Sequence, residues 1–178
     1  MTDSIYSSRE CHTENDVKIL FCDFCQVQPL IAVGMANKTV SIFDSDECKS
    51  IMGPIQHKNM STTSLSWQTK CANLFVGWES GTIEIFAMNH KIKSFQRIWM
   101  NDSIHCHAVN LILWNSLGTF FVCADKDGMC SSSKMTNNSI VPLSHFKLKS
   151  ETNVALFEPI ENFMQTNDLS NVKVTPLE

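Results

Sequence analysis

The sequence predicts an all-β fold of repeated small antiparallel sheets, because it contains an internal repeat, alternating apolar residues within each unit, and turn residues between the alternating runs. An ungapped shift of 43 residues places Phe24 on Trp67, Ile31 on Leu74, Val33 and Gly34 on Val76 and Gly77, and Thr39 to Phe43 on Thr82 to Phe86. A further shift of 47 residues places Leu65 and Trp67 on Ile112 and Trp114, Leu74 on Phe121, and Gly81 on Gly128. We therefore expect three units.

Within each unit, apolar residues recur with the period of two that half-buried strands show. The expected strands are Ile31–Val33, Val40–Phe43, Leu74–Val76, Ile83–Phe86 and Phe120–Cys123, with almost no helix before residue 140. Gly81 and Gly128 each end a short polar stretch that predicts a tight hairpin turn, where glycine supplies a positive φ. The stretch after Gly128 is poor in strand-forming residues, which makes the third unit less regular.

A sheet of this size has two apolar faces and cannot bury both alone, so neighbouring units must pack face to face. A repeat of about 40–45 residues with four strands is typical of the blades of a WD-repeat β-propeller. His105 precedes the strand that ends at Trp114, and such a histidine in WD repeats bonds to a turn aspartate, here Asp125 or Asp127. His57 lies at nearly the same place in the second unit. The expected fold is therefore all-β, with about three recognisable blades of an incomplete WD-repeat propeller.

We expect residues 15–160 to form this partial propeller, after a polar segment at 1–14 and before a polar, flexible tail at 161–178. The residues that define the blades are Trp67, Gly81, His105, Trp114 and Gly128. Both tryptophans are expected in the core. Since an incomplete propeller leaves apolar faces and strand edges uncovered at its ends, the chain is expected to associate or misfold when expressed alone.

The composition and charge of the chain exclude several classes of function. The 178 residues are 43% hydrophobic and 18% charged, which predicts a folded globular protein. The net charge of −4 and the scattered lysines and arginines do not supply the basic surface that nucleic acid requires. The N-terminus lacks the apolar stretch of a signal peptide, and no segment approaches the roughly 18 apolar residues of a membrane span. We expect a cytoplasmic protein without a nucleic-acid partner or a transmembrane segment.

The eight cysteines are expected to remain thiols in a reducing compartment. Cys22 and Cys25 have a metal-binding spacing, which Cys11 and His12 would complete as a four-ligand site. Cys22 aligns with apolar residues in the other two units, so a core cysteine is favoured, and no metal or cofactor is expected. Neither a nucleophile with a base nor a glycine-rich phosphate loop is recognisable, so we expect neither an enzyme nor a small-molecule substrate.

The run from Asn73 to Phe86, with Gly-Trp-Glu-Ser-Gly at 77–81, resembles the second N-terminal blade of the intraflagellar transport protein 140 family. Asp46 to Cys48 resembles the turn after the first blade of that family, and His105 to Gly118 the entry to its third; the resemblance covers about residues 15–160. It implies a non-catalytic scaffold of the IFT-A complex, which links cargo to the retrograde dynein motor in cilia. Other IFT-A subunits are the implied partners, retrograde transport and cilium assembly the implied roles, and the cilium and ciliary base the implied location.

Trp78 and Glu79 are the residues that we single out for partner contact, because they lie at a blade-edge turn where the resemblance is strongest. Propellers bind partners through such loops, and tryptophan is enriched at interface hot spots. The alternative for Trp78 is that it packs under the next blade. The alternative function is a generic WD-repeat adaptor of another cytosolic complex.

Overall fold

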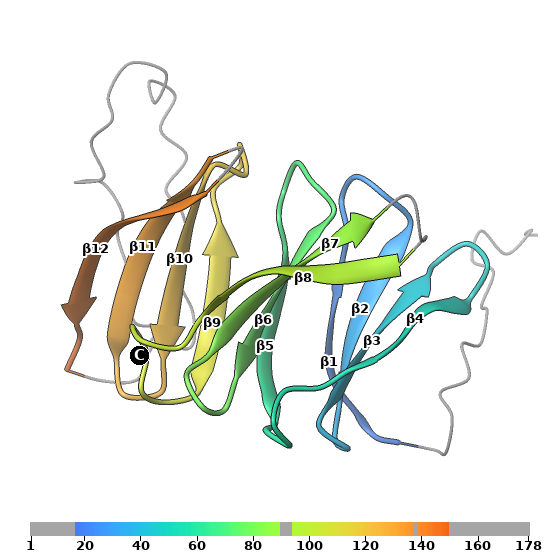
Figure 1. Ribbon diagram of the computed structural model, residues 1–178, viewed down its shortest axis with the longest axis horizontal. Coiled ribbons are helices and arrows are strands. Elements are labelled where there is room, and N and C mark those ends of the chain that lie inside the picture. Colours follow the sequence, from blue (N-terminus) through green and yellow to red (C-terminus); the bar gives the residue numbers. More distant parts are fainter. Residues whose placement is uncertain (1–16, 90–93, 137–138, 150–178) are drawn as a thin grey trace, which may run out of the picture.

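The computed structural model describes residues 17–89, 94–136 and 139–149, which form antiparallel strands in three four-stranded sheets (Figure 1). Blade 1 contains β1 (Ile19–Phe24), β2 (Leu30–Met35), β3 (Thr39–Asp44) and β4 (Lys49–Ile55). Blade 2 contains β5 (Thr62–Trp67), β6 (Asn73–Trp78), β7 (Ile83–Asn89) and β8 (Ser94–Asn101). Blade 3 contains β9 (Val109–Trp114), β10 (Phe120–Asp125), β11 (Met129–Met135) and β12 (Ile140–Lys147). Within each blade, strands that are consecutive in the sequence are neighbours in the sheet.

The predicted all-β fold with about three blades is confirmed. The five expected strands lie within β2, β3, β6, β7 and β10, and no helix occurs in the described part of the chain. The stretch after Gly128 forms β11 despite its four polar residues, because it is hydrogen-bonded on both sides, to β10 and to β12. The expected segments at 1–14 and 161–178 lie outside the described residues.

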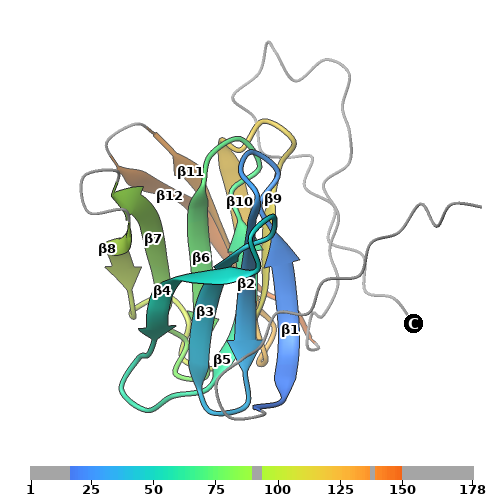
Figure 2. The ribbon, with the colours of Figure 1, turned by 90° about the vertical axis from the view of Figure 1, so that its right-hand side faces the viewer.

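The three blades stand side by side in a row, with blade 2 in the middle (Figure 1). Figure 2 shows this row from the blade 1 side. One apolar cluster lies between blades 1 and 2 and includes Ala32, Ile42, Trp67 and Trp78. A second lies between blades 2 and 3 and contains Phe75, Ile85, Ile112, Trp114, Phe121 and other buried residues. Blade 2 therefore buries both of its faces, which is the face-to-face packing expected of the repeat.

The first strands of the blades, β1, β5 and β9, are linked by hydrogen bonds that cross from blade to blade. The Asp23 carboxylate accepts a bond of 2.7 Å from the backbone N–H of Trp67, and the Asp23 carbonyl accepts one of 3.1 Å from the indole Nε1 of Trp67. Between blades 2 and 3, the Val109 carbonyl accepts from the hydroxyls of Thr63 and Ser64 at 2.8 and 2.6 Å. These bonds fix the register of neighbouring blades along the row.

The expectation that Cys22 is a core cysteine is wrong, since the structure exposes it. Phe24, which aligns with the two buried tryptophans, is 61% exposed. The alignment places both residues on the correct face of the strand, the one opposite to blade 2, because they pair with Val33 and Ile31 across from β2. No described strand packs against that face of blade 1, so the expected burial does not occur.

Candidate protein-binding rim

One edge of the row gathers the turns that contain Gly81 and Gly128 and the connections that contain His57 and His105. It carries the β2–β3, β6–β7 and β10–β11 turns, at residues 36–38, 79–82 and 126–128, and the connections between blades at 56–61 and 102–108. We call this edge the rim. Its loops contact one another across blades: the Lys38 ammonium donates to the Asn59 carbonyl at 2.9 Å, and the backbone N–H of Lys126 donates to the Ala108 carbonyl at 2.9 Å.

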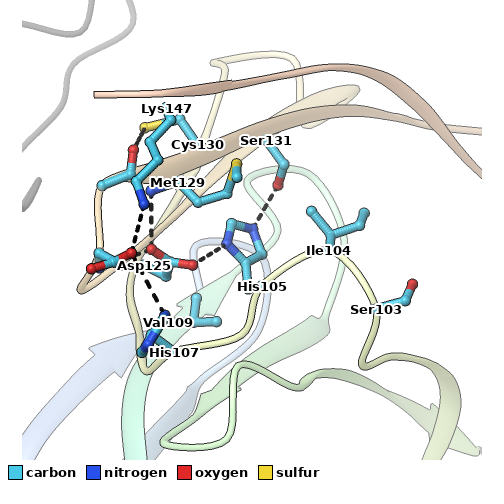
Figure 3. Close-up of polar contacts among 12 residues, drawn as sticks. Ser103, Ile104, His105, His107, Val109, Asp125, Met129, Cys130, Ser131 and Lys147 are labelled. Atoms are coloured by element: carbon cyan, nitrogen blue, oxygen red, sulfur yellow. Dashed lines mark hydrogen bonds and ion pairs between the residues drawn. The ribbon is translucent and has the colours of Figure 1, made fainter. Parts of the chain in front are cut away.

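In blade 3, His105 holds the connection 102–108 to the sheet beneath it (Figure 3). Its Nδ1 lies 3.1 Å from Oδ2 of Asp125, and its Nε2 lies 2.8 Å from the Ser131 hydroxyl. The other carboxylate oxygen of Asp125 accepts from the backbone N–H groups of Asp127 and Met129 at 2.9 and 3.0 Å. The sequence-based network between His105 and a turn aspartate therefore forms with Asp125, and Ser131 completes it.

Ser131, His105 and Asp125 are the residue types of a serine-hydrolase triad, and they are connected in the same order. Here, however, they are 5%, 1% and 1% exposed, so the hydroxyl has no path to a substrate. Burial lowers the pKa of His105, although the hydrogen bond and the charge of Asp125 act in the opposite direction. The neutral imidazole can donate to Asp125 and accept from Ser131, which satisfies all three buried side chains and makes the cluster structural.

In blade 2 the corresponding hydrogen-bond network is centred on a buried glutamate, Glu84. At the 47-residue shift, Trp78 takes the place of Asp125 and Glu84 that of Ser131. Glu84 is 1% exposed and accepts from the Trp78 indole at 3.0 Å and from Arg97 at 2.5 Å. His57 lies with its Nδ1 3.2 Å from Glu84.

The Glu84 carboxylate therefore joins β6, β7, β8 and the connection 56–61. Sequence reasoning did not single out Glu84 or Arg97. The signal that could have found Glu84 is a charged residue between Ile83 and Ile85, at the repeat position that holds a serine in blade 3.

The structure places Trp78 in the interior, with 0% exposure and its ring 5.5 Å from that of His57. The side chain is therefore packed between blades, as its alternative interpretation expected, and it offers no surface to a partner. Glu84 makes this burial favourable, because its carboxylate accepts a hydrogen bond from the indole N–H of Trp78 inside the blade. The choice of Trp78 as an exposed contact residue is accordingly corrected.

Glu79, the other residue singled out for partner contact, lies exposed at the β6–β7 turn. Its backbone N–H donates to the Ser61 carbonyl at 2.9 Å, and its carboxylate accepts from the Ser61 N–H at 3.2 Å. Hydrogen bonds that the Ser61 backbone and side chain give to the carboxylate lower the pKa of Glu79, and the charge of Lys38 lowers it further. Glu79 thus presents a fixed negative charge on the rim, with one lysine nearby.

Three of the rim residues near Glu79 have a left-handed backbone although they are not glycine. Lys38, Lys58 and Asn59 have φ values of 67°, 43° and 58°. Lys58 and Asn59 form a tight turn closed by the bond from the Met60 N–H to the His57 carbonyl at 2.7 Å. Such conformations cost free energy and persist where the surroundings determine them, so this part of the rim has a defined shape.

Gly81 has a φ of +86° and lies in the β6–β7 turn, beside the connection 102–108 of blade 3. A Cβ at this position would lie 2.2 Å from the His105 carbonyl oxygen. Only glycine therefore lets the β6–β7 turn rest against the connection 102–108. Gly128, with a φ of +82°, has the corresponding place in blade 3.

The described residues contain no group of three or more histidine, cysteine or acidic side chains placed to hold a metal ion. Cys11 and His12, which the four-ligand alternative requires, lie outside the described residues. A cleft of about 340 Å³ lies at the opposite edge from the rim, where Val27, Lys70 and Cys71 are among its lining residues. Within the described ranges, no helix is long and apolar enough to cross a membrane.

Comparison with known families finds one match that spans nearly the whole chain. The model of the IFT140 first β-propeller matches residues 5–176, which include the three described blades and the rim. A search of curated proteins finds no match. The repeated four-stranded blades agree with the family match, and the chain belongs to the IFT140 first β-propeller family.

Proposed function

We propose that this chain is a non-catalytic scaffold of an IFT-A-type complex, which supports retrograde ciliary transport and cilium assembly through protein contacts. The observation that carries the proposal is the family match over residues 5–176. The proposed partners are other IFT-A subunits, and the proposed location is the cytoplasm, the ciliary base and the cilium. No cofactor is part of the proposal.

The rim supports a binding role better than a catalytic one. The groups with catalytic potential, His105, Asp125 and Ser131, are buried and satisfy one another. The groups that reach solvent stand on loops held from below by the His105 and Glu84 clusters. A rigid rim with fixed charges loses little conformational entropy on binding a protein partner, which favours affinity.

Glu79 is the residue that we propose for partner contact. It is exposed, its carboxylate accepts a hydrogen bond from the Ser61 N–H, and Ser61 belongs to the connection that contains the left-handed residues Lys58 and Asn59. A partner with a basic side chain at this position would find a preorganised acceptor. Trp78 contributes by supporting this turn from inside the blade.

The experiment is to tag the gene at its native locus and to recover its partners from ciliated cells. Enrichment of IFT-A subunits supports the proposal, whereas a set of partners unrelated to cilia leaves only the generic WD-repeat adaptor. Glu79→Lys is expected to reduce the recovery of the direct partner while the melting temperature is unchanged. Glu47→Lys is the matched control, since Glu47 is an exposed carboxylate at the β3–β4 turn, on the opposite edge.

A further inference from the structure

The cleft on the edge opposite to the rim lies between blades 1 and 2. The β1–β2 turn lines one side of it with Val27 and Gln28, and the β5–β6 turn lines the other with residues 70–73. The end of β7 contributes Ala87 and Met88. Both turns stand at the upper edge of the row in Figure 1. The cleft is therefore separate from the rim and from the buried clusters beneath it.

The lining of the cleft combines an apolar base with a single charge. Ala72 and Met88 pack against the apolar cluster between blades 1 and 2, so they separate the cleft from the core. Val27, which is 46% exposed, adds an apolar side chain on the side of blade 1. Among the described residues that line the cleft, Lys70 alone is charged. An occupant that matches this lining has an apolar group and a carboxylate.

The β5–β6 side of the cleft is held in place from blade 3. The Gln68 side chain donates to the Gly118 carbonyl at 2.6 Å, and the Thr69 hydroxyl donates to the Asn115 carbonyl at 3.0 Å. The Asn73 amide in turn donates to the Gln68 side chain at 2.7 Å. Because these bonds fix the turn in the absence of a partner, binding costs little conformational entropy on this side.

The size and exposure of the cleft favour a peptide segment over an enclosed small molecule. Its volume of about 340 Å³ is near the lower end of the roughly 300–1,000 Å³ that is typical of ligand pockets, so it holds few side chains. Small-molecule pockets bury most of their ligand, whereas Val27, Lys70 and Cys71 are exposed. A segment that continues beyond the cleft in both directions suits such an open site.

We propose that this cleft binds a short segment of a partner protein in which an apolar residue stands next to an aspartate or glutamate. The apolar side chain lies over Ala72 and Met88, and the carboxylate pairs with the Lys70 ammonium. The proposal goes beyond the partner contact at Glu79, which lies on the rim, and it gives the chain a second binding edge. It does not depend on which protein binds the rim.

The test uses the full 178-residue chain and a phage-displayed library of random peptides. The selected peptides are expected to share an apolar residue beside an acidic one. Lys70→Glu should weaken the binding of these peptides, made synthetically, by roughly tenfold or more, because it places a like charge against their carboxylate. Lys126→Glu is the matched control, since it makes the same change of charge at an exposed residue of the rim. Equal losses in the two variants, or a selection that returns no such peptides, would overturn the proposal.

Alkylation of two exposed thiols locates the bound peptide. Cys71 lines the cleft, and Cys106 lies on the rim. A saturating peptide is expected to slow the iodoacetamide alkylation of Cys71 several-fold and to leave that of Cys106 unchanged. Unchanged alkylation of Cys71 would place the peptide elsewhere and would contradict the proposed site. N-acetyl-leucine at the same concentration should not protect Cys71, and equal protection would assign the cleft to small carboxylates instead of a protein segment.

Discussion

The Trp78 indole donates a 3.0 Å hydrogen bond to Glu84, at the two positions that hold Asp125 and Ser131 in blade 3. Blade 2 thus replaces an aspartate of the turn by an aromatic side chain and supplies the negative charge from the next strand. The Glu84 carboxylate remains buried, and His57 and Arg97 contact it together with Trp78. Blades 2 and 3 therefore each have a hydrogen-bonded polar cluster under the rim, built from different residues.

Glu84→Gln is expected to destabilise the chain by about 1–3 kcal/mol. The amide keeps the volume but loses the charge, and its NH₂ group cannot accept from the donors that converge on Glu84. Urea unfolding followed by tryptophan fluorescence measures the change. Glu47→Gln is the control, because that carboxylate is largely exposed and pairs with the exposed Lys49. An equal effect of the two variants would contradict the role of the buried cluster.

The stability of the chain is expected to fall as the pH falls below about 6.5 because of His105. Burial lowers the folded-state pKa of His105 below its ordinary value of 6.5, so the unfolded chain binds the proton first. The stabilisation is present above pH 6.5 and is lost as the pH falls through the folded-state pKa. Urea unfolding at pH 7.5 and 5.5 tests this.

The variant that isolates the effect is His105→Asn, in which the dependence of stability on pH between 7.5 and 5.5 should be weaker than in the unmodified chain. His107→Asn serves as the control, since His107 is more than half exposed. A pH dependence that survives His105→Asn unchanged would assign the effect to another group.

Gly81→Ala is expected to destabilise the chain by about 2–4 kcal/mol. The new Cβ meets the His105 carbonyl oxygen at 2.2 Å, and the positive φ adds strain. Because both obstacles are backbone features, a side-chain rotation cannot relieve them. Gly53→Ala is the matched control: nothing lies within 4 Å of its added Cβ, so its stability should stay within about 1 kcal/mol of the unmodified chain.

Trp67→Phe is expected to cost about 1 kcal/mol more than Trp114→Phe. Both tryptophans are buried at equivalent repeat positions, but the Trp67 indole donates to the Asp23 carbonyl, whereas the buried Trp114 Nε1 has no acceptor among the described residues. Removal of the Trp114 indole N–H therefore loses no such bond. Chemical unfolding of the two variants side by side measures the difference, and the reverse order would contradict it.

The exposed face of blade 1 is expected to cause self-association of the isolated chain. Ile19, Leu20 and Phe24 are 52%, 46% and 61% exposed on β1. Phe24→Glu should shift the concentration-dependent elution in gel filtration towards the monomer. Leu117→Glu, at a turn outside the sheet faces, should not. A monomer at all concentrations before substitution would show that this face does not associate.

The repeat in the sequence was sufficient to predict the blades, because strand alternation and turn glycines are local signals. The repeat was insufficient where burial depends on a neighbouring blade. Phe24 lies on the expected face of its strand, but no described strand covers it, whereas Trp67 at the same repeat position is in the core. The rim was predicted in part. His105 and Asp125 follow the usual pattern, but Glu84 is a charged residue in a strand, and its burial becomes intelligible only once His57, Trp78 and Arg97 are seen around it.

The meander within each blade and the short links between first strands also bear on how the chain folds. Contacts within a blade join strands that are adjacent in the sequence, so each sheet closes with short loops and little entropy cost. Blade 2 is stabilised by hydrogen bonds to both neighbouring blades. Trp67 donates to Asp23 of blade 1, and Ser64 donates to Val109 of blade 3. Opening of blade 2 must break both interfaces, so its amides are the last in this row to exchange with solvent, and unfolding proceeds inward from the outer sheets.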